Sequence, residues 1–248
     1  VGVLRTWRAM CPELQERWSE DEQPEHWEGV EMENGRVVKL VLQEFGLTGA
    51  VPAEVGRLSA IRVLVLADNE LTSVPAEIGQ LASLKELWLN ANKLTSVPAE
   101  IWQLTSLTEL DLYNNQLTSV PAEIGQLILL TYLNLGKNQL TSVPAEIGQL
   151  ILLEELILRD NRLTSVPTEI GQLAALDYLN LDTNQLTSVP AEIGQLTSLR
   201  KLHLDGNPLT SVPAEIGPWL TSLEEFFISD NQRTIMPAEI RAAYGLRN

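Results

Sequence analysis

The side chains that could most readily perform chemistry are His203 and two aspartates near it, Asp182 and Asp205. An imidazole beside carboxylates can transfer protons at neutral pH or bind a divalent metal ion. The step from Asp182 to Asp205 matches the period of a repeat in this sequence, so a fold that repeats in the same way would place them on adjacent turns. The other histidine, His26, lies far away in the sequence, and a metal site usually needs more ligands than these. We therefore interpret the group as a solvated patch or a contact for a basic partner residue, and we predict no metal site.

Signatures of the common catalytic and cofactor sites are missing from the sequence. It contains no P-loop, no Gly-x-Ser-x-Gly and no dinucleotide-binding fingerprint. Cys11 is the single cysteine; no nucleophile motif surrounds it, and a helical segment there suits a buried thiol. We predict a protein that is not an enzyme, with no catalytic residues and no cofactor.

Most of the chain is organised by a repeat, of which residues 84–104, LKELWLNANKLTSVPAEIWQL, are one copy. The asparagine of the copies recurs at a constant step, at Asn69, Asn92, Asn115, Asn138, Asn161, Asn184 and Asn207. A further copy, with one inserted residue near Pro218, places its asparagine at Asn231. Self-similarity at this period predicts a solenoid, in which each turn packs on its neighbours.

Each part of the copy has a local physical role. Leu87 and Leu89 flank Trp88, an alternation that predicts a short strand with one face buried. Asn92 suits the turn that follows, because its amide can bond nearby backbone groups and needs such partners if it is buried. Pro98 stops sheet pairing and favours the start of a short helical turn. Stacked copies would then form a parallel sheet on the concave side.

The pattern L-x-x-L-x-L-x-x-N-x-L resembles the leucine-rich repeat family over roughly residues 37 to 240. The period and the I-G-x-L segment are most similar to intracellular members, such as Ras-group proteins, scribble-type scaffolds, Roco GTPases and bacterial relatives. The resemblance implies an α/β fold: a right-handed, horseshoe-shaped leucine-rich-repeat solenoid with a concave parallel sheet and short helical or 3₁₀ turns on the convex side. Phe45 replaces the asparagine in the first copy and Arg233 replaces a leucine in the last, as terminal repeats are expected to vary.

The repeat divides the chain into three predicted segments. They are an N-terminal cap at 1–36, leucine-rich repeats at 37–236 in about nine turns, and a C-terminal capping helix at 237–248. Trp27-Glu-Gly-Val and the later Gly-Arg-Val resemble the cap of plant-type leucine-rich repeat proteins, without its paired cysteines. We interpret Trp7, Trp18 and Trp27 as the core of this cap rather than a binding site.

The amino-acid composition limits the classes of binding partner and the cellular compartment expected for the protein. The net charge is −16, from 33 acidic and 17 basic residues, which argues against nucleic-acid binding. Much of the acidity comes from one scaffold position, occupied by Glu54, Glu77, Glu100, Glu123, Glu146, Glu169, Glu192, Glu215 and Glu239. A single cysteine cannot form an intrachain disulfide, which favours a reducing, cytoplasmic location. No transmembrane run or signal peptide is present, so we predict no membrane insertion.

The residues between and just after the strand leucines vary from copy to copy, whereas the scaffold positions hardly change. They should point to the concave face, and tryptophan, tyrosine and arginine among them are typical of interface hot spots. The predicted partner-binding residues are Glu86, Trp88, Asn90, Glu109, Asp111, Tyr113, Tyr132, Asn134, Ile157, Arg159, Tyr178, Asn180, Asp182, Lys201, His203, Asp205 and Phe227. Drift at unconstrained positions is the alternative explanation, but it should favour plain polar residues over aromatic ones.

We therefore predict a monomeric, non-enzymatic module that binds a protein or peptide on its concave face. Two alternatives stay open: the recognition arm of a larger signalling enzyme, such as a Roco-type GTPase or kinase, and an expanded or engineered repeat scaffold without a dedicated ligand.

Two departures from the repeat fall outside the predicted binding face. Trp102 replaces a recurring glycine, and we expect it to be exposed on the outer side. Ile128, Leu129, Ile151 and Leu152 replace the small residues of other copies. Extra packing within the solenoid is the favoured interpretation of these four, and a second contact surface or dimer contact is the other.

Overall fold

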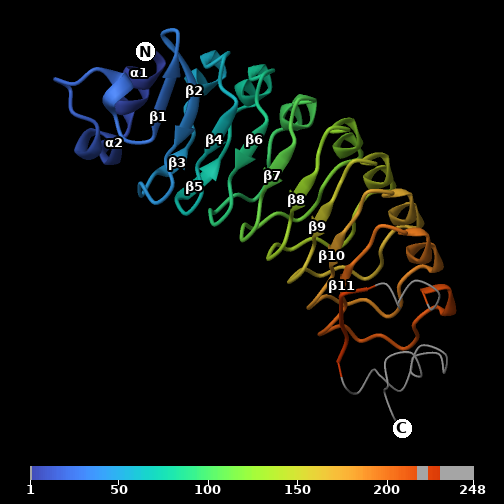
Figure 1. Ribbon diagram of the computed structural model, residues 1–248. Helices are drawn as coiled ribbons and strands as arrows, with labels where there is room; N and C mark the ends of the chain where they lie inside the picture. Colours follow the sequence, from blue (N-terminus) through green and yellow to red (C-terminus); the bar gives the residue numbers. More distant parts are fainter. Residues whose placement is uncertain (1, 217–222, 230–248) are drawn as a thin grey trace. The chain divides into compact units, whose positions relative to one another are not determined.

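The computed structural model describes residues 2–216 and 223–229 (Figure 1). The predicted capping helix at 237–248, Asn231, Arg233 and the inserted residue near Pro218 lie outside the described residues. The chain separates into two compact units, Val1–Leu117 and Thr118–Asn248.

The first unit begins with helices and continues with strands that alternate with 3₁₀ turns. Its elements are α1 (Gly2–Met10), α2 (Pro12–Arg17), η1 (Pro24–His26), β1 (Val30–Glu33), β2 (Arg36–Val41), β3 (Thr48–Ala50), η2 (Ala53–Arg57), β4 (Val63–Val65), β5 (Glu70–Ser73), η3 (Ala76–Gln80), β6 (Glu86–Trp88), η4 (Ala99–Gln103) and β7 (Glu109–Asp111). The strands β1-β2-β4-β6-β7 form a sheet that is parallel except for the β1–β2 hairpin, and β3 pairs with β5.

The second unit repeats the same strand and 3₁₀ alternation. Its described elements are η5 (Ala122–Gln126), β8 (Tyr132–Asn134), η6 (Ala145–Gln149), β9 (Glu155–Ile157), η7 (Thr168–Gln172), β10 (Tyr178–Asn180), η8 (Ala191–Gln195), β11 (Lys201–His203), η9 (Ala214–Ile216) and β12 (Glu225–Phe227). Strands β8 to β12 pair in parallel and in order. The predicted leucine-rich-repeat solenoid, with a parallel sheet and short 3₁₀ turns, is confirmed.

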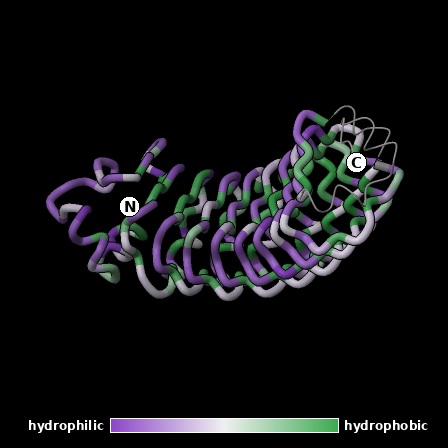
Figure 2. Tube along the Cα trace, turned by 90° about the horizontal axis from the view of Figure 1, so that it is seen from below, coloured by the Kyte–Doolittle hydropathy of each residue, from purple (hydrophilic) through white to green (hydrophobic). Residues whose placement is uncertain are grey.

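The repeat leucines form the core of each unit. The central leucine of each regular strand, such as Leu87 in β6 and Leu156 in β9, is fully buried. Hydrophobic and hydrophilic stretches alternate along the turns in Figure 2. A 3₁₀ turn closes each copy up to η9 and starts one residue after the proline. For example, Pro98 precedes η4 in an extended conformation, with φ −66° and ψ 149°.

The repeat asparagines are buried among the turns, as their recurrence suggested. The Asn92 amide donates to the carbonyls of Leu66 at 2.9 Å and Leu89 at 3.1 Å, and its Oδ1 accepts the Leu71 N–H at 2.9 Å. One side chain thus satisfies backbone groups in its own copy and in the preceding one. Because a buried backbone group without a partner is costly, this asparagine fixes the spacing between turns.

The recurring glycine allows adjacent 3₁₀ turns to approach closely. A Cβ on Gly171 would lie 2.5 Å from the carbonyl oxygen of Glu192 in the next turn, well inside van der Waals contact. Trp102 occupies this position in its own copy and is only 2% exposed, so our expectation of an exposed side chain is wrong. Burial removes the large apolar surface of the indole from water, which is favourable.

The N-terminal tryptophans are core residues. Trp7, Trp18 and Trp27 are at most 2% exposed, and the rings of Trp18 and Trp27 stack with centroids 4.8 Å apart. The indole N–H groups of Trp18 and Trp27 donate to the backbone carbonyls of Glu28 at 2.9 Å and Ser19 at 2.8 Å, respectively. Burial of these rings beside the first strands agrees with a structural role.

Two local features of the N-terminal segment agree with the residues that predict them. Pro12 separates α1 from α2, and Asn34-Gly35 forms the turn between β1 and β2 with positive φ at both residues. Cys11 lies between the two helices and is half-buried. Partial burial, together with the nearby Glu13, raises the pKa of its thiol, which does not favour a reactive thiolate.

Candidate partner-binding surface

The strand register lines up the predicted binding residues in rows within each unit. In β6 and β7, Glu86 pairs with Glu109 and Trp88 with Asp111. In β8 to β12, one row is Tyr132, Glu155, Tyr178, Lys201 and Glu225, and the other is Asn134, Ile157, Asn180, His203 and Phe227. We call these rows, together with the predicted residues that directly follow each strand, the strand face.

The strand face is only partly open to solvent. Asp205 and Phe227 are exposed, whereas most of the other predicted residues are half-buried. The half-buried set is Glu86, Trp88, Asn90, Glu109, Tyr113, Tyr132, Ile157, Arg159, Tyr178, Asp182, Lys201 and His203. Half-buried aromatic rings combine a fixed position with accessible apolar surface, which suits recognition.

Three predicted residues are buried instead: Asp111, Asn134 and Asn180 are 7%, 8% and 5% exposed. In each, a side-chain oxygen accepts the N–H two residues further on, at distances of 2.8 Å, 3.1 Å and 3.0 Å. Short polar side chains often support turns in this way. These residues shape the turn after the strand and leave little side-chain surface for a partner.

In the first unit, the strand face contains two polar groups without a partner. Neither the Trp88 Nε1 nor the Asn90 Oδ1 makes a hydrogen bond among the described residues, although both atoms are shielded from solvent. Buried polar atoms are rarely left unsatisfied in native proteins. A small shift of these two side chains would offer the Trp88 N–H as a donor and the Asn90 oxygen as an acceptor to a bound molecule.

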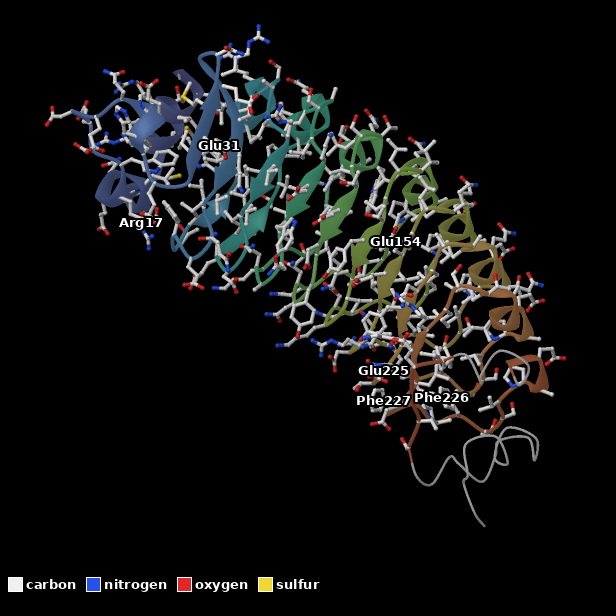
Figure 3. The ribbon with its side chains drawn as sticks, viewed as in Figure 1. Arg17, Glu31, Glu154, Glu225, Phe226 and Phe227 are labelled. Carbon is white, nitrogen blue, oxygen red and sulfur yellow. The ribbon has the colours of Figure 1, made fainter. Side chains whose placement is uncertain are left out.

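In the second unit, His203 is surrounded by aromatic rings. It meets Tyr178 edge to face with centroids 5.0 Å apart and Phe227 likewise at 4.5 Å. The Tyr178 hydroxyl lies 3.3 Å from His203 Nδ1 and accepts the amide of Asn180 at 2.7 Å. Figure 3 shows Phe227 beside Phe226 and Glu225 on β12. Aromatic contacts and hydrogen bonds therefore hold the imidazole in place.

Charged groups complete this cluster. His203 lies 3.6 Å from a carboxylate oxygen of Asp182 and 3.4 Å from one of Glu225, and Lys201 binds Glu225 at 2.8 Å. The hydrogen bond from Lys201 lowers the pKa of Glu225. Asp205 meets Asp182 through its backbone, since its N–H donates to Asp182 Oδ1 at 2.7 Å.

Sequence reasoning paired His203 correctly with Asp182 but left Glu225 out of the predicted residues. With the inserted residue near Pro218 allowed for, the sequence repeat already places Glu225 in the row of Lys201, and the strand pairing agrees; its contact with His203 is what residue type alone does not indicate. Among the residues that the structure describes, no group of three or more His, Cys, Asp or Glu could hold a metal ion. The side chains of this cluster form a network of ion pairs and hydrogen bonds around His203.

We expect Asp182→Asn to change the pH dependence of stability. Partial burial raises the pKa of the Asp182 carboxyl above its ordinary 3.8, against the lowering effects of the Asp205 N–H and His203. The folded state therefore holds this proton more tightly than the unfolded chain, so its contribution to stability falls as the pH rises above 3.8 through the folded-state pKa. Asparagine keeps the acceptor oxygen without the charge.

Urea unfolding of both proteins, from below pH 3.8 to neutral pH, measures this effect. The stability of the variant relative to wild type should increase with pH across that window and then level off. A difference that is the same at every pH would contradict the assigned cause.

Within the described part of the chain, no helix has the length and apolar character needed to cross a membrane.

Stacked copies with a partly open strand face define a repeat protein of the solenoid class. Models of two leucine-rich repeat families match the chain: the leucine-rich repeat region at residues 117–226 and the leucine rich repeat at residues 59–117. The chain belongs to the leucine-rich repeat proteins, a family that generally serves as a non-enzymatic binding module.

Solved structures of leucine-rich repeat proteins are similar. A Leptospira interrogans leucine-rich repeat protein is 45% identical, with a TM-score of 0.70, and the match covers 74% of this chain and 46% of that one. The plant membrane receptor kinase GASSHO1/SCHENGEN3 of Arabidopsis thaliana, in complex with Casparian strip integrity factor 2, is 32% identical over its ectodomain, with a TM-score of 0.78 and coverage of 85% and 26%. The Arabidopsis receptor kinase HAESA, in complex with the peptide hormone IDA and a co-receptor, is 28% identical, with a TM-score of 0.81 and coverage of 92% and 41%.

This chain spans less than half of each of these three solved chains, between 26% and 46% of their length. A search of curated proteins gave no match.

Proposed function

We propose that this chain is a non-enzymatic module that binds a protein or peptide through its strand face. The observation that carries the proposal is the set of half-buried aromatic rings on that face, Trp88 and Tyr113 in the first unit and Tyr132 and Tyr178 in the second. Aromatic side chains held in place by a rigid sheet lose little freedom on binding, which favours affinity. GASSHO1/SCHENGEN3 is solved in complex with Casparian strip integrity factor 2 and HAESA in complex with the peptide hormone IDA, which supports this class of partner.

The hydrogen-bonding groups of the strand face also favour a ligand that has a polar backbone. Trp88 offers a donor and Asn90 an acceptor, and a peptide main chain carries both of the complementary groups. Carboxylates near these residues, including Glu86, would favour basic side chains on the same ligand.

The experiment is affinity capture from a lysate of the source, with the purified chain as bait, followed by mass spectrometry and titration of the identified partner. One-to-one saturable binding by a chain that is monomeric alone would support the module. Repeated failure to enrich any protein or peptide, with the fold intact, would favour a scaffold without a dedicated ligand.

A second candidate is the recognition arm of a larger signalling enzyme. The similarity to receptor-kinase ectodomains, over only part of their length, favours this alternative. The complete open reading frame tests it: a kinase or GTPase domain in the same reading frame would support it, and a frame that encodes repeats alone would remove it.

Two further expectations stay predictions. Limited proteolysis tests the division at residues 36 and 236, since cleavage should concentrate near these points if they separate folded segments. Cell fractionation tests the cytoplasmic location, which an extracellular or membrane fraction would contradict.

A further inference from the structure

An unusual group of apolar side chains lies in the turns that precede two strands of the second unit. Six large hydrophobic side chains are exposed among the described residues, and four of them are Ile128, Leu129, Ile151 and Leu152, at 54%, 45%, 56% and 45%. Our favoured interpretation of these residues as extra packing is therefore wrong, because their side chains point into solvent. We call these four residues the apolar ridge.

The apolar ridge occupies the turns that lead from η5 to β8 and from η6 to β9. These strands pair directly, with Tyr132 opposite Glu155, so the two apolar pairs belong to neighbouring turns spaced by about 4.8 Å. The same positions in other copies hold Ser59-Ala60, Ala82-Ser83, Thr105-Ser106, Ala174-Ala175 and Thr197-Ser198.

The turn itself does not need apolar residues. The Ile151 N–H donates to Gln149 O at 2.9 Å, and Thr105 and Thr197 make the same bond in their own copies at 2.9 Å. Since small or polar residues support the same geometry, the ridge contributes nothing that the scaffold requires. Clustered exposed apolar side chains are typical of an interaction surface.

An acidic pocket lies directly beyond the apolar ridge. It has a volume of about 370 Å³ and is lined by Glu154, Glu155, Ala175, Asp177 and Arg200. Ala175 is the counterpart of Leu152 in the next copy, so the pocket begins where the ridge ends. Figure 3 labels Glu154, the lining residue nearest to Leu152 in the sequence.

The pocket carries an excess of negative charge. Its single guanidinium, on Arg200, already forms ion pairs with Asp177 and, at 3.5 Å, with Glu224. Glu154 and Glu155 are exposed and form no ion pair among the described residues. A cation that entered the pocket would therefore meet two carboxylates without a competing partner.

We propose that the apolar ridge and the acidic pocket form a second docking surface, for a partner segment that carries aliphatic or aromatic side chains next to a lysine or arginine. The apolar side chains would cover Ile151 and Leu152 and remove them from water. The basic side chain would enter the pocket beside Glu154 and Glu155, which fixes the orientation of the segment. This surface adjoins the strand face, to which Glu155 belongs, and it adds to the proposed function a contact that does not use the aromatic residues.

Charge complementarity favours this occupant over two others. A second copy of the chain would bring another net charge of −16 toward the pocket, and an anionic membrane would bring phosphate charges toward the same carboxylates. A basic, apolar segment has neither cost.

The test uses a phage-displayed random peptide library as the probe, selected on the whole chain. Counter-selection uses Ile128→Thr, Leu129→Ser, Ile151→Thr and Leu152→Ser together, which copies the residues at Thr105-Ser106 and Thr197-Ser198. Circular dichroism and urea unfolding check that this ridge variant keeps its fold. We expect the enriched peptides to place aliphatic or aromatic residues beside a lysine or arginine.

Fluorescence anisotropy with the enriched synthetic peptide then measures affinity. We expect the ridge variant to weaken binding at least tenfold, and Glu154→Gln with Glu155→Gln to weaken it several-fold in a salt-dependent way. The control Glu169→Gln with Glu192→Gln removes the same charge from η7 and η8 and should leave affinity unchanged.

Three results would overturn the proposal. The first is that no peptide is enriched over counter-selection. The second is that the enriched peptides lack basic residues or bind the ridge variant equally well. The third is that light scattering shows a dimer of the wild-type chain and a monomer of the ridge variant. The last result would assign the ridge to contact between copies.

Discussion

Asn161→Ala should lower the free energy of unfolding by about 3 kcal/mol, the expected cost of leaving several buried backbone groups without partners. The Asn161 amide donates to the carbonyls of Leu135 at 2.9 Å and Leu158 at 3.0 Å, and its Oδ1 accepts the Leu140 N–H at 3.0 Å. The residue is 8% exposed, so water cannot readily replace these bonds. Urea unfolding followed by circular dichroism measures the effect.

The adjacent exposed residue supplies a matched control. Arg162→Ala should change stability by less than about 0.5 kcal/mol, as is usual for surface substitutions. Asn161→Asp keeps an acceptor for the Leu140 N–H but loses both donors, so it should also destabilise the protein. Equal stability of Asn161→Ala and Arg162→Ala would show that the hydrogen bonds of the repeat asparagines do not hold the turns together.

Serine in place of Trp88, Tyr113, Tyr132 and Tyr178 together should weaken partner binding at least 100-fold, or by about 2.7 kcal/mol. Aromatic hot spots commonly contribute about 2 kcal/mol or more each when truncated, although such losses do not add. The four side chains are half-buried, so each offers apolar surface without being essential to the leucine core. Titration of the captured partner by calorimetry measures the loss.

The control for this variant keeps the strand face and changes the 3₁₀ turns. Glu123→Gln and Glu146→Gln remove carboxylates from η5 and η6 and should leave affinity within about twofold, the range of surface substitutions that make no contact. If the serine variant keeps its unfolding transition and binds as tightly as wild type, the partner contacts another surface.

The fold could be predicted because the repeat specifies it many times. One copy is ambiguous, but leucines, asparagine and proline that recur together at a constant step leave few ways to bury the leucines. The burial of Asn92 follows from the same argument, since a polar residue that recurs in a packed turn must bond the backbone. Trp102 was harder, because a lone exception at a glycine position does not show where the side chain can go.

The candidate surface was only partly predictable, since a repeat gives the direction of a side chain but not its environment. Asp111 and Asn180 lie on strand positions that face outward, yet the turn after the strand buries them. Ile151 and Leu152 show the reverse, because apolar character suggested packing while their position in the turn exposes them. Both outcomes depend on the path of neighbouring copies, which residue type alone does not specify.

Site-specific photo-crosslinking tests the central claim, that the strand face binds the partner, most directly. A benzophenone amino acid would replace Tyr132 on β8 in one variant and Glu169 on η7 in another, and each would be irradiated with the captured partner. We predict a covalent adduct with the partner from position 132 and none from position 169. Adducts from position 169 alone would place the partner on the 3₁₀ turns and contradict the account.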